Sequence, residues 1–228
     1  MAIAADAGVP VLPRGGGTSQ CGQTVGRAVV MDVSRHLNRV VEFDPEARTA
    51  WVEPGVVLDE LNAFLKPHGL WFPVDVSTGS RATIGGMAGN NSCGARSLHY
   101  GTMRDNVIAI DAILADGTEM HLGELPADIS EVGFSPTQRS MVEKLLALGL
   151  REALEIDARF PKMMRRVGGY NIDALVPSNK PINLSHLLVG SEGTLAYSKQ
   201  IKIKLSVLPK NKVLGICHFP TFYEAMDS

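Results

Sequence analysis

The chain has 228 residues, of which 45% are hydrophobic and 20% charged, and its formal net charge at pH 7 is -2. A chain of this length and composition can bury a sizeable core, so we expect one large domain or two subdomains rather than a disordered chain. The balanced charge, with no run of Lys or Arg, argues against nucleic-acid binding and against a polybasic membrane patch.

No apolar stretch is long enough to cross a bilayer, and the first residues lack the basic start and apolar run of a signal peptide. We therefore predict a cytoplasmic location and leave peripheral membrane association open. The three cysteines, Cys21, Cys93 and Cys217, are scattered and odd in number, which does not suit a disulfide framework or an iron–sulfur site. The six histidines also lack a metal-binding spacing, so we predict no metal site.

The first part of the chain has the pattern of short strands followed by one helix. In chain order, we predict a short helix at 2–7 that stops at Gly8, strands at 9–12, 28–33, 39–43 and 49–52, a turn at 44–47, and an amphipathic helix at 57–67 that ends at Gly69. The buried face of that helix would carry Val57, Leu61, Phe64 and Leu65. Because a helix of under two turns cannot hold itself together, we expect that sequence is missing before Met1.

The second part continues the mixture of strands and helices. We predict a buried strand at 107–114, a hairpin turn at Asp116-Gly117, a strand at 118–122, a helix capped by Ser135 with Pro136 at its first position, alternating strand residues at 201–207, a strand at 213–219 and the first turns of a helix at 221–228. Hairpins mixed with helices favour an α+β or mixed α/β domain over a doubly wound sheet. The last helix has nothing after it, so we expect a second domain that begins here and is truncated.

The first glycine-rich stretch runs from Pro13 to Ser19. Glycine lets the main chain approach a ligand and expose its N–H groups, which suits a phosphate or pyrophosphate. Two better-known phosphate motifs do not fit, because Gln23 stands where a P-loop needs Lys and Gln20 stands where a Rossmann loop needs its third glycine. A structural turn stays open as the alternative for this loop alone.

The second glycine-rich stretch runs from Thr78 to Gly94. We expect residues 83–86 to present consecutive main-chain amides, and Asn90, Asn91 and Ser92 to supply side chains that donate or accept around a ring edge or phosphate. The alternative is an irregular surface crossover. Arg165 and Arg166 could attract a substrate carboxylate, although a solvated loop edge is the simpler interpretation.

Five motifs in order carry a resemblance to a known family. They are the two glycine-rich stretches, Tyr100-Gly101-Thr102, Gly168-Gly169-Tyr170-Asn171-Ile172 and Val189-Gly190-Ser191-Glu192-Gly193-Thr194-Leu195. Together they closely resemble the PCMH-type FAD-binding domain of the FAD-linked oxidases, the superfamily of vanillyl-alcohol oxidase and p-cresol methylhydroxylase. Within it, the chain looks most like the branch of D-lactate, glycolate and D-2-hydroxyglutarate dehydrogenases.

The resemblance implies FAD held between two α/β subdomains. It divides the chain into an FAD-binding domain at 1–208, with the remainder of a first subdomain at 1–55 and a second subdomain at 56–208, and the start of a truncated cap domain at 209–228. The cofactor-binding residues that it implies are Arg14, Gly15, Gly16, Gly17, Thr18, Ser19, Gly22, Thr78, Gly79, Thr83, Gly85, Gly86, Asn90, Ser92, Gly94, Tyr100, Glu192, Gly193, Ala196 and Tyr197.

Three positions depart from the family pattern. Members with a covalent flavin on the first loop carry His where this chain has Thr18, so we expect non-covalent FAD. The family's usual glycine after Leu195 is Ala196, and Gln200 replaces a common Glu, which affects the contacts expected at the adenine end.

By this resemblance, the chain is the FAD-binding part of a dehydrogenase that oxidises a small D-2-hydroxy acid to the 2-oxo acid by hydride transfer to flavin N5. Electrons would pass to an acceptor other than NAD, and a cap domain, with an iron–sulfur domain in large members, would complete the protein. Because relatives take the base and the carboxylate-binding cations from the cap, no catalytic residue is assigned. The alternatives are a non-catalytic flavin-binding fragment, or a flavoenzyme of the same fold acting on a sugar or sugar nucleotide.

Overall fold

A five-stranded antiparallel sheet forms the centre of the molecule, in the computed structural model that describes residues 1–163, 165–211 and 213–227. Its strands, in spatial order, are β3 (Val40–Asp44), β4 (Thr49–Val52), β8 (Ala196–Lys204), β6 (Val107–Leu114) and β7 (Glu119–Leu122). Alternation explains the sheet's two faces, since Ile201 and Ile203 of β8 are buried while Lys204 is exposed.

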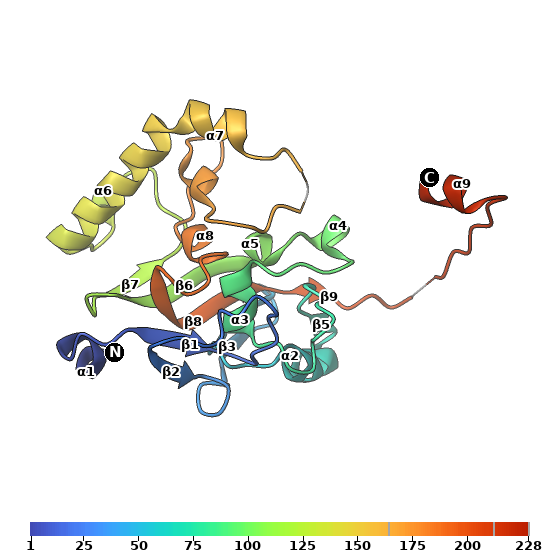
Figure 1. Cartoon of the computed structure of the whole chain (residues 1–228), viewed down its shortest axis with the longest axis horizontal. Coiled ribbons are helices and arrows are strands. Elements are labelled where there is room, and N and C mark those ends of the chain that lie inside the picture. Colours follow the sequence, from blue (N-terminus) through green and yellow to red (C-terminus); the bar gives the residue numbers. More distant parts are fainter. Residues whose placement is uncertain (164, 212, 228) are drawn as a thin grey trace.

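Two small strand pairs flank this sheet. The strands β1 (Val11–Arg14) and β2 (Val29–Asp32) pair in parallel, and β5 (Leu70–Trp71) pairs antiparallel with β9 (Ser206–Val207). In the view of Figure 1, β1 and β2 lie below β6, β7 and β8 of the sheet. Residues 40–52, expected in a first subdomain, thus pair within the central sheet, and the division into subdomains stays a prediction.

The helices lie on both sides of the sheet. They are α1 (Ala2–Asp6), α2 (Leu58–Leu65), η1 (Lys66–His68), α3 (Ile84–Asn90), α4 (Ser97–Tyr100), α5 (Met103–Asn106), η2 (Ile129–Glu131), α6 (Pro136–Arg151), α7 (Ala153–Arg159), η3 (Ile172–Leu175), α8 (Ser185–Leu188) and α9 (Phe222–Asp227). Figure 1 places α6 and α7 above the sheet. Among the residues described, no helix combines the length and the apolar character that crossing a bilayer requires.

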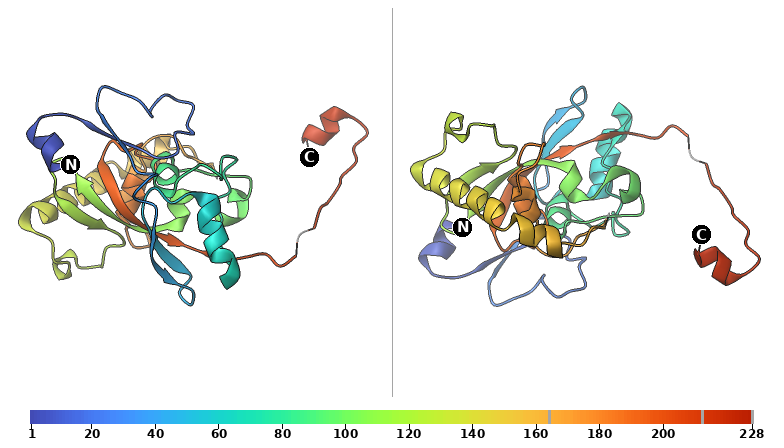
Figure 2. Two further views of the ribbon diagram at one scale, coloured as in Figure 1. Left: turned by 90° about the horizontal axis from the view of Figure 1, so that it is seen from below. Right: turned by 90° about the horizontal axis from the view of Figure 1, so that it is seen from above.

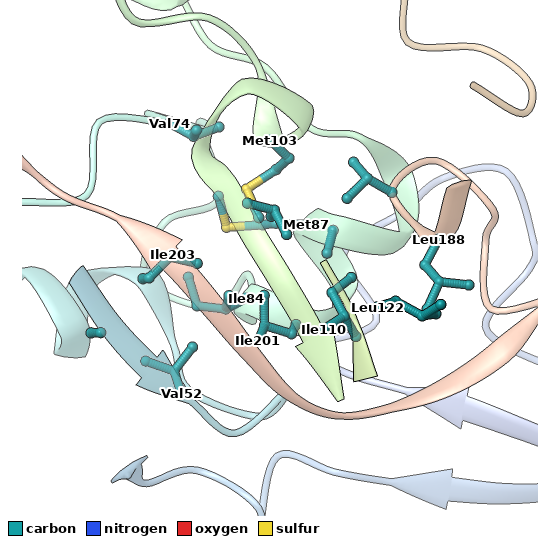
Figure 3. Close-up of a cluster of buried hydrophobic side chains, with 14 of the residues drawn as sticks. Val52, Val74, Ile84, Met87, Met103, Ile110, Leu122, Leu188, Ile201 and Ile203 are labelled. Carbon is teal, nitrogen blue, oxygen red and sulfur yellow. The ribbon is translucent and has the colours of Figure 1, made fainter. Parts of the chain in front are cut away.

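One buried apolar cluster joins the sheet to the helices. In Figure 3, Ile110 and Ile201 of the sheet lie in the same cluster as Ile84 and Met87 of α3 and Leu188 of α8. Each of these side chains is at most 8% exposed. Since burial of apolar surface is the main favourable term in folding, this cluster fixes α3 and α8 relative to the sheet, and both helices lead into the candidate site.

Several predicted features are confirmed at the level of single residues. The buried strand is found at Val107–Leu114, and the Asp116-Gly117 turn connects it to β7. Ser135 caps α6 in a capping box with Gln138, and Gly69 ends η1 in the left-handed conformation. These features depend on local chemistry, which explains why the sequence alone predicts them.

Two predictions about apolar side chains are wrong. Phe64 is 43% exposed, because the buried face of α2 follows Leu58, Leu61 and Leu65; its ring lies 5.4 Å from that of Phe43 instead. Residues 213–219 form no strand, and Figure 2 shows this segment leading away from the sheet to α9. A strand needs a neighbour for its main-chain hydrogen bonds, and none of the described strands lies beside this segment.

A polar network on one side of the sheet joins α5 to η3. Arg104 Nη1 donates to Asp173 Oδ2 at 2.7 Å, and Arg166 Nη2 donates to Asp173 Oδ1 at 2.6 Å. Burial alone would raise the pKa of Asp173, but hydrogen bonds and charge from both arginines outweigh it and hold the pKa below its usual value. The solvated loop edge expected for Arg166 is therefore wrong, since it is paired and lies over the Phe160 ring at 4.5 Å.

We predict that Asp173→Asn lowers the free energy of unfolding by about 2 kcal/mol at pH 7, because two half-buried arginines lose their anion. The lowered pKa means that Asp173 stabilises the fold above the unfolded-state pKa of about 3.9 and that this contribution is lost as the pH falls through the folded-state value. In urea unfolding, the difference in the free energy of unfolding between wild type and variant should therefore become smaller below about pH 4.

Other acid effects are separated from that of Asp173. Burial lowers the pKa of His186 to about 4, and the Asp173 charge partly offsets this effect. Both proteins therefore lose stability as His186 gains its proton between about pH 6.5 and 4, and the variant loses more, so the stability difference widens in this range before it narrows. Asp6→Asn, at an exposed position on α1, should leave the unfolding curve unchanged. A gap between Asp173→Asn and wild type that stays constant down to pH 2.5 would contradict the assignment.

Candidate functional site

The two glycine-rich stretches meet each other at main-chain distance. A Cβ added to Gly15 would collide with Thr83 Oγ1, and one added to Gly16 would collide with the main-chain oxygen of Arg81. Only residues without a side chain allow this approach, so the glycines bring the two segments together. The two segments therefore lie side by side, although they are far apart in the sequence.

A third segment closes the same space. A Cβ on Gly193 would lie 3.6 Å from the Pro13 ring, in ordinary contact, so the stretch after α8 lies beside the first loop. The main cleft lies between these three segments and has an empty volume of about 1020 Å³, including the part open to solvent.

Most of the residues predicted for the cofactor site line the main cleft. Those are Arg14, Gly15, Gly16, Gly17, Thr18, Ser19, Thr78, Thr83, Gly85, Gly86, Asn90, Ser92, Glu192, Gly193, Ala196 and Tyr197. Gly22, Gly79, Gly94 and Tyr100 are not part of this lining. Gly79 and Gly94 lie where a Cβ would collide with Asp59 and Asp75, so both pack against protein, and Tyr100 packs against Trp71 with ring centroids 5.4 Å apart.

Sequence reasoning missed a further set of lining residues. They are Pro13, Gln23, Thr24, Val33, Pro54, Val76, Ala82, Met87, Gly89, Leu188, Ser191 and Ser198. Several are neighbours of predicted residues, and Gln23 stands where a P-loop would have its lysine. Distance in the sequence hides the others, since Val33 and Pro54 reach the cleft only through the packing of β2 and β4.

The prediction that the second glycine-rich stretch presents free amides is wrong. Residues 84–90 form α3, and the N–H groups of Ile84 and Gly85 donate to the main-chain oxygens of Val56 and Pro54, both at 2.8 Å. The N–H of Gly86 donates to Thr83 Oγ1 at 3.3 Å, so Thr83 caps the helix. The apolar side chains at 84, 87 and 88 made this a helix with a buried face, which the glycine count obscured.

The first loop, in contrast, keeps its amides available. Within the described ranges, the main-chain N–H groups from Gly15 to Ser19 have no hydrogen-bond partner. Gly17 has φ 64°, and an added Cβ would lie 2.7 Å from Arg14 Nη2, so the guanidinium lies over the loop. Successive free amides beside a guanidinium form an environment that suits a phosphate or carboxylate.

Unpartnered side-chain atoms point to the same space. Buried polar atoms without a hydrogen-bond partner among the described residues include Gln23 Oε1, Asn90 Oδ1 and Tyr197 Oη, and all three residues line the main cleft. A buried polar group that lacks a partner costs free energy, so such atoms indicate a missing ligand or water. Burial also raises the pKa of Tyr197, with the Glu53 charge adding to the effect, so its hydroxyl stays protonated at neutral pH.

An apolar groove continues from the main cleft. It is lined by Met1, Ala5, Val9, Pro10, Val11, Pro13, Ile113, Ala115, Gly117, Gly193, Thr194, Leu195, Ala196 and Tyr197. Four residues, Pro13, Gly193, Ala196 and Tyr197, line both spaces. The site thus offers free amides on one wall, unpaired hydroxyl and amide groups within, and an apolar extension, a combination that fits a ligand with both a phosphate and flat rings.

The described part of the chain contains no group of three or more His, Cys, Asp or Glu side chains that could hold a metal ion. Cys21 and Cys217 are exposed free thiols, and Cys93 is a half-buried one. Of the three positions that depart from the family pattern, Thr18 and Ala196 line the main cleft.

Curated relatives share most of this chain. A D-2-hydroxyglutarate dehydrogenase of Pantoea ananatis is 37% identical over 95% of this chain and 21% of its own length, and one of Escherichia coli is 35% identical over 94% and 21%. A probable mitochondrial D-lactate dehydrogenase of Danio rerio is 31% identical over 96% of this chain and 35% of its own. The chain thus spans about a fifth of the length of the first two.

The fold has a solved counterpart. An alkyldihydroxyacetonephosphate synthase matches 92% of this chain and 31% of its own chain with a TM-score of 0.59, at 22% identity, a level at which the likeness shows the fold alone. This agrees with the α+β, PCMH-type architecture expected from the five motifs. The sequence profile of the FAD binding domain matches residues 1–123, more than half of the chain. The chain therefore belongs to the FAD binding domain family.

Proposed function

We propose that this chain is the FAD-binding part of a flavin-dependent dehydrogenase that oxidises a D-2-hydroxy acid to the 2-oxo acid. The observation that carries the proposal is the meeting of three segments around one cleft, where the N–H groups from Gly15 to Ser19 have no partner in the described part of the chain. The D-2-hydroxyglutarate and D-lactate dehydrogenases among the relatives support the substrate class.

The first loop would hold the pyrophosphate of FAD. Its free amides can donate to the phosphate oxygens, and Arg14 adds a charge-assisted donor at the same loop. Glu192 also lines the cleft with φ 54°, and its carboxylate can accept from ribose hydroxyls but not from a phosphate. Thr18 takes the place of a flavin-linking His, so we propose that FAD is bound without a covalent bond.

The flavin and adenine would occupy the two ends of the site. Asn90 Oδ1 and Tyr197 Oη are unpaired and would bind the ribityl chain or the ring edge. The apolar groove along Val9, Pro10 and Leu195 would take the adenine, because the flat faces of an aromatic base can pack against apolar side chains. Residues 1–208 would then be the FAD-binding domain, and residues 209–228 the start of a cap domain.

When bound, FAD supplies the hydride acceptor at flavin N5. The residues of this chain would bind and orient the cofactor and keep water from its ring. Oxidation of a hydroxy acid also needs a base for the hydroxyl proton and cations for the carboxylate. We assign neither to this chain and propose that a cap domain supplies them, with an electron acceptor other than NAD.

The direct test uses the full-length protein that contains this chain. We expect the purified protein to carry FAD that is released on denaturation, and to reduce an artificial dye with D-2-hydroxyglutarate, D-lactate or glycolate as donor. A flavin that stays with the denatured protein would contradict non-covalent binding. Turnover of a sugar donor, with silence across the acid panel, would contradict the substrate class.

Gly17→Val tests the first loop. A valine at φ 64° is strained and would push against the Arg14 guanidinium, so the loop should lose its shape while the sheet stays folded. We expect FAD retention on gel filtration to fall at least tenfold. Gly133→Val is the matched control, because Gly133 is exposed, away from the cleft lining, and an added Cβ meets nothing within 4 Å.

Tyr197→Phe separates a role in ligand binding from a role in stability, because we expect it to lower the affinity for FAD without lowering the free energy of unfolding. Tyr197 is 6% exposed and its hydroxyl is unpaired, so the variant without FAD should be as stable as wild type or more stable in urea unfolding. Its affinity for FAD, measured by flavin fluorescence, should fall about tenfold because a hydrogen bond to the ligand is lost. Unchanged affinity together with lower stability would assign the hydroxyl to the fold instead.

A further inference from the structure

The third wall of the main cleft has a conformation that needs external support. This wall, residues 188–193, contributes Leu188, Ser191, Glu192 and Gly193 to the lining. Glu192 has φ 54°, which is unfavourable for a residue with a side chain, and Gly190 has φ 86°. Such a backbone persists only where surrounding contacts over-determine it, so the neighbours of this wall decide its shape.

Main-chain hydrogen bonds tie the wall to α3 on one side. The N–H of Gly190 donates to the main-chain oxygen of Ala88 at 2.9 Å, and the N–H of Glu192 donates to that of Gly89 at 3.0 Å. Since Gly89 also lines the main cleft, these two bonds set the spacing between two of its walls. These two hydrogen bonds form only when the N–H groups of Gly190 and Glu192 point toward α3.

Asn171 holds the wall from behind. Its Nδ2 donates to the main-chain oxygen of Val189 at 2.7 Å and to that of His186 at 3.4 Å, and the residue is only 1% exposed. Asn171 is not part of the cleft lining. Tyr170 adds a second link, with its Oη 2.8 Å from Thr194 Oγ1.

The other end of the Asn171 amide is fixed as well. Its Oδ1 accepts from Arg104 Nη1 at 3.4 Å and from Arg166 Nη2 at 3.3 Å, the two arginines that pair with Asp173. An amide has two donor and two acceptor positions, and here all of them have partners. A buried amide with this full set of bonds can take one orientation only.

Asn91 connects the same network to the end of α3. Its Oδ1 accepts from the N–H of Arg104 at 3.0 Å, and its φ is 49°, so it ends α3 in the left-handed conformation. The residue before it, Asn90, carries one of the unpaired oxygens of the cleft. The network thus reaches two walls of the cleft without touching its interior.

We propose that Asn171 is a positioning residue for FAD binding, because its side-chain amide orients the 188–193 wall through the main-chain oxygen of Val189. The inference rests on the proposed function for the identity of the ligand. The contacts of Asn171 with the wall do not depend on that function. It assigns a role to the Gly168–Ile172 motif, which lies outside the main cleft.

Asn171→Asp isolates the link to the wall. The carboxylate keeps an oxygen for Arg104 and Arg166 but places a second oxygen against the main-chain oxygens of Val189 and His186. It removes both N–H donors and adds a negative charge, and it leaves the volume nearly unchanged. We expect FAD to bind about tenfold more weakly, as measured by flavin fluorescence. Hydrogen exchange at the N–H groups of Gly190 and Glu192, followed without FAD, should become about tenfold faster.

Asn106→Asp is the matched control, because Asn106 is also buried, at 4% exposed, and its Nδ2 also donates to two main-chain oxygens, those of Tyr100 and Thr102, but it contacts neither the 188–193 wall nor the cleft lining. Under conditions where both variants are folded by circular dichroism, it should change FAD affinity by less than threefold and leave exchange at 190–192 unchanged. Exchange in β6, residues 107–114, should stay slow in both variants. A similar loss of FAD affinity in the two variants, or unchanged exchange at 190–192 in Asn171→Asp, would overturn the inference.

The two readouts also separate this inference from the proposed function. If the wild-type protein binds no FAD, the proposed function fails, while the exchange at Gly190 and Glu192 still decides whether Asn171 orients the wall. If the wild-type protein binds FAD and Asn171→Asp binds it equally well, the positioning role fails and the proposed function stands.

Discussion

The site depends on the approach of the first loop to the segment before α3. Gly15 and Gly16 pack where any Cβ would collide with Thr83 Oγ1 or with the oxygen of Arg81. Protein interiors are close-packed, so a methyl group at either position would push the loop away from α3 and open the cleft. The contact depends on close packing, and none of the described residues accepts a hydrogen bond from the N–H groups of Gly15 to Ser19. These amides are therefore available to a ligand.

The two glycine-rich stretches therefore have different physical roles. In the first, the glycines allow the close approach to the segment before α3, and the loop amides have no partner among the described residues. In the second, the amides of Ile84, Gly85 and Gly86 are already bonded to protein, and the stretch contributes a capped helix with a buried face. Recognition of a ligand at this second wall must then come from side chains such as Asn90, whose oxygen lacks a partner.

Local chemistry explains which features the sequence alone predicts. The cap at Ser135, the turn at Asp116-Gly117 and the strand at 107–114 each follow from adjacent residues. The predictions that failed depend on partners far away in the sequence. Residues 213–219 have strand-forming side chains, but none of the described strands lies beside them. The proposed role of Asn171 depends on its contacts with Val189 and two arginines. Most of the proposed site residues could be located because the glycine motifs are continuous in sequence, whereas the residues that hold them in place are not.

Support from behind the cleft also has a physical rationale. Apolar packing is non-directional, so the buried cluster under α3 and α8 can fix where these helices lie but not which way a loop turns its oxygens and N–H groups. Hydrogen bonds are directional, and the left-handed conformation of Glu192 requires such direction. The amide of Asn171, itself held by Arg104 and Arg166, provides this directional support. It does so from outside the cleft lining. The wall can therefore be set before the cofactor arrives, which lowers the ordering cost of binding.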